Sequence, residues 1–127
     1  MHEGIETAFS GHSVDQTVAR LTKLIEAKGA KLFAVVDHSG EARAAGLAMP
    51  NTKLVIFGAP KAGTPMMLAE PSAALDLPLK VLVAESATGA TQLSWNSAKW
   101  LEDRHGLSDK SVPALQAAGA LARAAAE

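Results

Sequence analysis

The chain has 127 residues, 48% of them hydrophobic, and its 12 basic and 13 acidic residues give a formal charge of −1. This size predicts a single domain over residues 1–127, and the balanced charge argues against a nucleic-acid partner or an acidic membrane surface. The absence of cysteine excludes disulfides, a thiolate nucleophile and zinc–thiolate sites.

The first residues, 1–6, lack the basic region and the apolar stretch of a secretion signal. No apolar run along the chain approaches the length that a membrane-spanning helix needs. We therefore expect a cytoplasmic protein that does not contact a membrane.

The N-terminal part of the chain predicts a strand followed by a helix. Apolar and polar residues alternate over residues 5–9, as in a half-buried strand. Residues 13–16 form a capping-box pattern, which begins a helix that runs to Lys28 and stops at Gly29. The buried stripe of this helix is expected to consist of Val14, Val18, Leu21 and Ile25.

The second strand is predicted at residues 31–37. Its centre is apolar on both faces, which indicates a strand inside the sheet. Asp37 and His38 lie at the carboxyl end of this strand. Residues 39–47 contain good helix formers and predict one or two helical turns closed by Gly46.

The third strand, residues 53–57, leads into a stretch in which Gly58 to Pro65 contains two glycines and two prolines. Such a composition requires a sharp turn of the backbone. Thr64 followed by Pro65 is typical of a helix N-cap and first helical position. We therefore expect a helix from Pro65 to about residue 76, interrupted at Pro71.

The last part of the chain predicts a hairpin and two helices. Strands at residues 79–85 and 91–96 flank a turn at residues 87–90. A short helix follows from residue 97 to 105 and stops at Gly106. An alanine-rich helix over residues 112–126, within a helical tail of residues 108–127, offers only a thin apolar stripe.

This order of elements, strand, helix, four strands and helix, predicts the α+β class. The sheet is expected to be mostly antiparallel, with the helices packed on one face. The other face then needs a cover, which a second subunit can supply. We therefore expect a homodimer.

Five stretches carry a family resemblance: Val36-Asp37-His38, Gly46-Leu47, Leu54 to Met67, Ala74 to Val83, and Trp95-Asn96. Together they resemble the domain of unknown function 302 family, over about residues 5–107. The most specific parts are the Pro-Lys-Ala-Gly-Thr stretch at residues 60–64 and the Leu-Asp-Leu-Pro-Leu-Lys stretch at residues 75–80. The resemblance implies a strand, helix, four-strand and helix fold, known in dimeric bacterial and archaeal proteins, and no established activity.

Two departures from the family pattern fall near the candidate site. The family more usually has Gly-Asn-Pro where this chain has Gly58-Ala59-Pro60, and Tyr-Asn where it has Trp95-Asn96. Each departure removes a polar group, an amide in the first case and a hydroxyl in the second. A chemical site of the family at this loop would therefore be altered here.

Lys61, Gly63 and Thr64 are the first candidates for ligand binding. A helix N-terminus beside a lysine and a glycine is suited to an anion, because unpaired N–H groups and the helix dipole favour negative charge. The alternative is a tight turn in which Thr64 only caps the helix. The order of residues does not match a Walker loop, which disfavours nucleoside triphosphates.

His38 is the second candidate, as a ligand-binding residue or a general base near neutral pH. The alternative is a strand-end pair in which the imidazole bonds a backbone carbonyl, and Asp37 points to the opposite face of the strand. His2, His12 and His105 show no spacing typical of a metal site and are expected to be solvated. We expect neither a metal nor a cofactor.

Two functions remain open from the sequence. The first is a dimeric module that binds a small anionic or amphipathic molecule near Lys61 without chemistry. The second is an enzyme in which His38 acts as general base beside that loop on an anionic metabolite. The absence of cysteine, of a metal motif and of a second acid favours the binding module.

Overall fold

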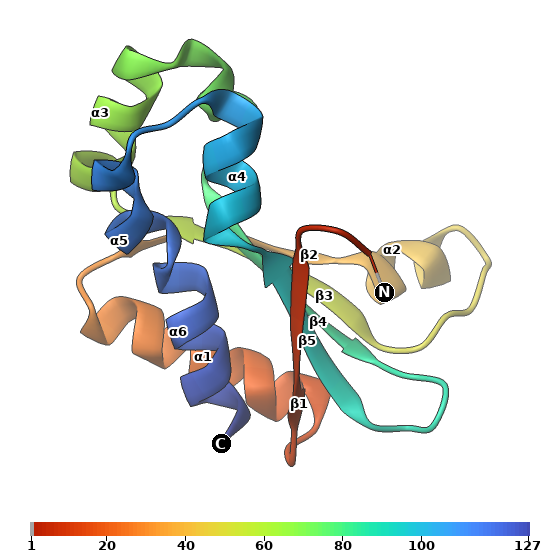
Figure 1. Cartoon of the computed structure of the whole chain (residues 1–127). Coiled ribbons are helices and arrows are strands. Elements are labelled where there is room, and N and C mark those ends of the chain that lie inside the picture. Colours follow the sequence, from red (N-terminus) through yellow and green to blue (C-terminus); the bar gives the residue numbers. More distant parts are fainter. Residues whose placement is uncertain (1) are drawn as a thin grey trace.

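The computed structural model describes residues 2–127. Its elements in chain order are β1 (Ile5–Ser10), α1 (Val14–Ala27), β2 (Lys31–Asp37), α2 (His38–Ala44), β3 (Thr52–Gly58), α3 (Pro60–Ala69), the 3-10 helix η1 (Pro71–Leu75), β4 (Leu79–Glu85), β5 (Thr91–Asn96), α4 (Ala98–His105), the 3-10 helix η2 (Asp109–Ser111), α5 (Val112–Leu115) and α6 (Ala117–Ala126). The strands form one antiparallel sheet in the order β1-β5-β4-β3-β2 (Figure 1). The α+β class predicted from the sequence is confirmed.

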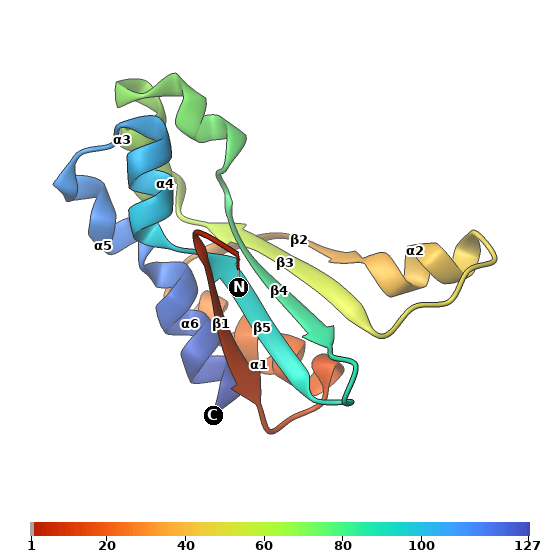
Figure 2. The same ribbon diagram turned by 45° about the vertical axis from the view of Figure 1, so that its right-hand side comes forward.

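The helices occupy three places around the sheet. α1 and α6 lie side by side across one face (Figure 1). α3, η1, α4 and α5 gather beyond the end of the sheet where β3 and β5 finish, whereas α2 projects from the opposite end (Figure 2). Among residues 2–127 there is no helix long and apolar enough to cross a lipid bilayer.

β2 forms one edge of the sheet, so the prediction that it lies inside is wrong. It pairs with β3, and a register shift separates Leu32 from Ala34. Two of its large apolar side chains are exposed to solvent, Phe33 by 46% and Val35 by 39%. β2 is paired along one edge only, with β3. Its side chains therefore have fewer neighbours than those of an inner strand, and an apolar sequence alone does not bury them.

The first helix begins as predicted. In α1 the Ser13 hydroxyl accepts the Gln16 N–H, and the Gln16 side chain accepts the Ser13 N–H, which completes the capping box. The buried face differs in one position, because Thr17 rather than Val18 is fully covered. The Thr17 hydroxyl bonds the Ser10 hydroxyl at 2.8 Å, so its polar atom is satisfied there.

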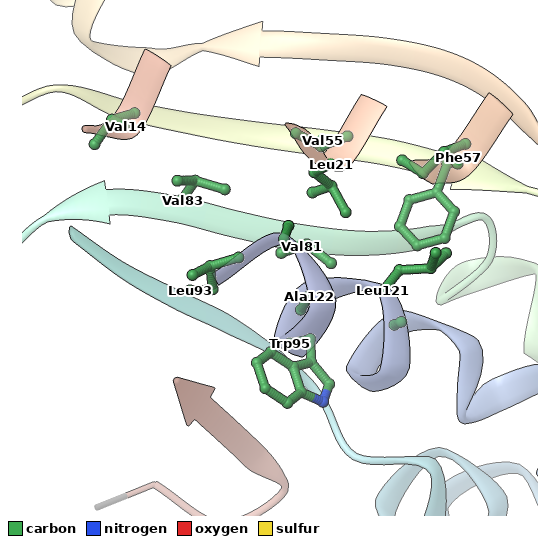
Figure 3. Packing of buried hydrophobic residues seen from close by; sticks show 13 residues of the cluster. Val14, Leu21, Val55, Phe57, Val81, Val83, Leu93, Trp95, Leu121 and Ala122 are labelled. Carbon is green, nitrogen blue, oxygen red and sulfur yellow. The ribbon is translucent and has the colours of Figure 1, made fainter. Parts of the chain in front are cut away.

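The main core fills the space between the sheet and the two helices on its face (Figure 3). The strands contribute the side chains of alternate positions that point toward α1 and α6. Those labelled in Figure 3 are Val55, Phe57, Val81, Val83, Leu93 and Trp95. This alternation is the one that fixes strand register, because a shift of one residue would expose the whole set.

The alanine-rich tail is not one helix but two, α5 and α6, separated at Gln116. Its thin apolar stripe packs on α1 and the sheet of the same chain, and Ala122 and Ala125 are fully buried. Gly119 permits this close approach, because a Cβ there would lie 2.8 Å from Nε1 of Trp95. The Arg20 side chain donates to the Ala125 carbonyl and so ties the end of α6 to α1.

A second, smaller core holds together the helices beyond the end of the sheet. Its buried members are Met66, Ala73, Leu101, Leu107 and Leu115, from α3, η1, α4, the following segment and α5. Between this cluster and the main core lies the candidate site.

Candidate functional site: an apolar cavity beside α3

The helix at the candidate site begins earlier than the sequence predicted. Pro60 is its first residue, after the N-cap Ala59, whereas the prediction placed the cap at Thr64 and the start at Pro65. Both prolines suit a helix start, and Pro65 is tolerated inside the helix at the cost of one N–H donor. The Gly63 N–H donates to the Ala59 carbonyl at 2.9 Å. That amide is therefore occupied within the helix, and an anion would need other donors.

A cavity of about 710 Å³ lies between α3, the edge strand β2 and the tail helices. It is lined by Leu24, Lys28, Ala30, Phe33, Phe57, Gly58, Ala59, Pro60, Ala62, Gly63, Met66, Met67, Leu77, Pro78, Leu79, Ala114, Ala117, Ala120, Leu121 and Ala124. Nearly all of these side chains are apolar. The cavity is therefore suited to an apolar group rather than to a bare ion.

Small residues create this space. Ala117, Ala120 and Ala124 recur at helical spacing on the face of α6 that lines the cavity. Ala62 and Gly63 line it from α3. Larger side chains at these positions would occupy the volume that now remains between the elements.

The two methionines of α3 pack in the second core. Met66 is 7% exposed and is one of its buried members. Met67 is partly buried against the same cluster, and both residues also line the cavity. Methionine is unbranched and flexible, so it adapts to apolar ligands of different shape.

Lys28 is the one charged residue among the described residues that line the cavity. It caps the C-terminal end of α1, and its side chain is exposed. Lys61 lies instead along a second groove of about 580 Å³, together with Lys110 and Glu70. α3 separates the two hollows, because its residues Ala62 and Met66 line both.

The structure separates the two sequence-predicted sites. Lys31, at the start of β2, pairs with Gly58, whereas Asp37 at its end pairs with Lys53. The helix that carries Lys61 begins just after Gly58, at the Lys31 end of β2, whereas His38 follows Asp37 at the other end. The length of the strand, about six residues at 3.3 Å per residue, separates the two by roughly 20 Å. His38 therefore does not act beside Lys61, and the enzyme hypothesis that joined them is wrong in its geometry.

His38 is the first residue of α2, and it is exposed. Asp37 before it is the N-cap, and its carboxylate accepts the Gly40 N–H at 3.0 Å and the Ser39 hydroxyl at 2.8 Å. These two bonds hold the pKa of Asp37 below its usual value, the Gly40 bond more strongly. Asp37 therefore has a structural role, and ligand binding by His38, Lys61, Gly63 and Thr64 stays a prediction.

Among His2, His12 and His105, which were predicted to be solvated, His2 is exposed whereas His105 is buried. His105 is only 8% exposed, with Nδ1 2.7 Å from the Ser72 hydroxyl and Nε2 2.5 Å from a carboxylate oxygen of Asp76. Nε2 of His12 lies 2.7 Å from the Glu127 carbonyl oxygen. Residues 2–127 hold no group of three or more His, Asp and Glu side chains placed to bind a metal ion.

Sequence reasoning missed most of the cavity. The one local signal was the spacing of Ala117, Ala120 and Ala124, which marks a helix face made of small side chains. The contribution of Lys28 and Phe33 depends on how α1 and β2 sit against α3. Such contacts between segments distant in the chain leave no periodic trace in the sequence.

A profile of the family described as Domain of unknown function DUF302 matches residues 5–127. The chain belongs to the DUF302 family. The resemblance seen in the sequence is confirmed, and the family match includes the tail helices that form one wall of the cavity.

The DUF302 fold is also seen in a solved structure. The crystal structure of an uncharacterized conserved DUF302 protein from Bacillus stearothermophilus matches this chain with a TM-score of 0.80. The two share 13% sequence identity, and the match covers 98% of this chain and 97% of the other. At this identity the likeness establishes the fold.

Curated relatives of this DUF302 chain come from Brucella. Fluoride-specific ion channel FluC 1 of Brucella suis biovar 1 (strain 1330) is 39% identical over 114 residues, which cover 90% of this chain and 45% of the relative. FluC 1 of Brucella abortus biovar 1 (strain 9-941) is also 39% identical, with 42% of its length covered. The chain thus spans less than half the length of these relatives.

Proposed function

We propose that this DUF302 chain binds a small amphipathic molecule, with the apolar body in the cavity and a negatively charged head group at the rim beside Lys28. The observation that carries the proposal is the lining: a cavity of about 710 Å³ in which, among the described residues, Lys28 alone is charged. Ligand pockets commonly measure roughly 300–1,000 Å³ and combine an apolar lining with few polar groups.

The driving force for such binding is the removal of apolar surface from water. Each methylene that enters the cavity gains about 0.8 kcal/mol, from which the entropy cost of association must be subtracted. The head group adds less, because the Lys28 ammonium is exposed and screened by solvent. Affinity should therefore follow chain length more strongly than charge.

The fluoride-channel name of the relatives does not fit this cavity as an ion site. A desolvated small anion needs several N–H or O–H donors in place of its water shell. The described lining supplies one ammonium group and mainly alkyl and aromatic surface. The name also refers to relatives of which this chain covers 42–45%. We therefore propose an amphipathic ligand rather than fluoride for this cavity.

Thermal-shift titration with decanoate tests the cavity. Ala120 is exposed on the cavity wall, so Ala120→Trp should fill the space without disturbing the core, and should abolish the shift seen with the unchanged protein. Ala19→Trp is the matched control, because Ala19 is exposed on α1 and does not line the cavity. An equal shift in both variants would contradict binding in this cavity.

A second comparison tests the head group. Lys28→Gln should weaken decanoate binding by up to about fivefold, the effect of an exposed ion pair worth roughly 0.2–1 kcal/mol, and should leave decanol binding unchanged. Loss of affinity for both probes would show that Lys28 acts through its alkyl chain and not through its charge.

We also propose that the binding module is a homodimer formed through the open face of the sheet. Side chains on β3 and β4 that alternate with the core positions point to this face, and they include Leu54, Ile56 and Leu82. α1 and α6 pack on the other face of the sheet (Figure 1), and these three side chains are partly exposed. The buried tail supports no part of this proposal, because α6 packs on its own sheet.

A further inference from the structure

Three side chains outside the cavity form a hydrogen-bonded series of a serine, a histidine and an aspartate. Ser72 lies in η1, Asp76 caps the C-terminal end of η1, and His105 is the last residue of α4. The Ser72 hydroxyl is 2.7 Å from Nδ1 of His105, and Nε2 of the same ring is 2.5 Å from Asp76. The series joins two elements that are separated by the hairpin of β4 and β5.

The protonation of the imidazole follows from its partners. A carboxylate only accepts hydrogen bonds, so Nε2 of His105 donates to Asp76. In the neutral ring Nδ1 is then the unprotonated nitrogen, and the Ser72 hydroxyl donates to it. The base nitrogen thus already accepts the proton that a serine nucleophile must lose.

His105 and Asp76 are largely buried, whereas Ser72 is exposed to solvent. The His105 side chain is 4% exposed and the Asp76 side chain 15% exposed. Arg104 donates from Nη1 to both carboxylate oxygens of Asp76, at 3.2 and 3.1 Å, which fixes the carboxylate. Ser72 itself is exposed, so a substrate can reach its hydroxyl.

We propose that Ser72 is a nucleophile for the hydrolysis of small carboxylic esters, with His105 as general base and Asp76 as the residue that orients the ring. The three residue types are those of a serine, histidine and aspartate triad, with the two ring nitrogens exchanged, because Ser72 contacts Nδ1 and Asp76 contacts Nε2. The groove of about 580 Å³ is lined by Glu70 and Gly106, which lie within two residues of Ser72 and His105 in the chain.

The reaction balances with water as the only co-reactant. The Ser72 oxygen attacks the carbonyl carbon while its proton passes to Nδ1 of His105. The tetrahedral adduct collapses, the bond to the leaving alcohol breaks, and His105 protonates the departing oxygen. Water then attacks the acyl-serine, gives its proton to His105, and the carboxylic acid leaves as the Ser72 hydroxyl is restored.

The test combines covalent labelling with turnover. Treatment with phenylmethylsulfonyl fluoride should add one sulfonyl group at Ser72, located by peptide mass spectrometry, and the protein should hydrolyse p-nitrophenyl acetate. Ser72→Ala should lose both, and His105→Gln should reduce hydrolysis by about 10²-fold or more. Ser86→Ala, at a serine between β4 and β5 that does not line the groove, is the matched control and should keep both.

Asp76 is tested as a positioning residue by a pair of variants. Asp76→Asn should lower the labelling rate and Asp76→Glu should restore part of it, with circular dichroism showing the same fold in each. Absence of labelling in the unchanged protein, or equal labelling and hydrolysis in Ser72→Ala, would overturn the proposal and leave the three residues as a structural link between η1 and α4.

Discussion

At the scale of single residues, Asp37 shows how local hydrogen bonds set a charge. Its carboxylate accepts the Gly40 N–H and the Ser39 hydroxyl at the start of α2, and these bonds lower its pKa in the folded chain. A depressed folded pKa contributes stability that is present above the unfolded value of about 3.9 and is lost as pH falls through the folded pKa. The N-cap of α2 should therefore weaken in acid.

Asp37→Asn tests this dependence. The amide oxygen still accepts the Gly40 N–H, but the side chain no longer titrates. We expect the free energy of unfolding of the variant to fall less than that of the unchanged protein between about pH 5 and about pH 2.5, measured by urea denaturation at each pH. The same fall in both proteins would show that Asp37 does not carry this dependence.

At the scale of elements, two helix glycines have different surroundings. A Cβ at Gly119 in α6 would lie 2.8 Å from Nε1 of Trp95, and this nitrogen is held by a hydrogen bond to Glu6. A Cβ at Gly63 in α3 would lie 3.9 Å from its nearest neighbours, which is an ordinary contact. The close packing of α6 on β5 thus depends on Gly119, whereas α3 has room for a larger residue.

Alanine at each position separates the two effects. Gly63→Ala should stabilise the protein by roughly 0.5–1 kcal/mol through helix propensity. Gly119→Ala should destabilise it by about 1–3 kcal/mol, because α6 must move away from Trp95. Urea denaturation measures both, and a stabilised Gly119→Ala variant would contradict the packing argument.

At the scale of the whole molecule, the open face of the sheet predicts association. Leu82 lies near the centre of this face, on β4, and a charge there should prevent two sheets from packing. Light scattering after size exclusion should give twice the chain mass for the unchanged protein and the single chain mass for Leu82→Lys. Leu68→Lys is the control, since Leu68 on α3 is 79% exposed, and it should remain dimeric. A single-chain mass for the unchanged protein at micromolar concentration would rule out the dimer.

The sequence by itself determined the local elements of this protein. Two strand segments around a turn at residues 87–90 predicted the hairpin of β4 and β5, and the capping pattern at Ser13 predicted the start of α1. These signals are short-range, because a strand or a cap is specified by neighbours within a few residues. The stop of α4 at Gly106, whose φ is +66°, is of the same kind.

The tertiary structure decided what lies between the elements. β2 is apolar like an inner strand, yet the strand order places it at the edge, where Phe33 lines the cavity. α3 begins at Pro60, although the sequence also offers a helix start at Thr64-Pro65. His105 meets Ser72 and Asp76 only because η1 packs on α4. The cavity and this side-chain series depend on long-range packing, which a reading of local patterns does not contain.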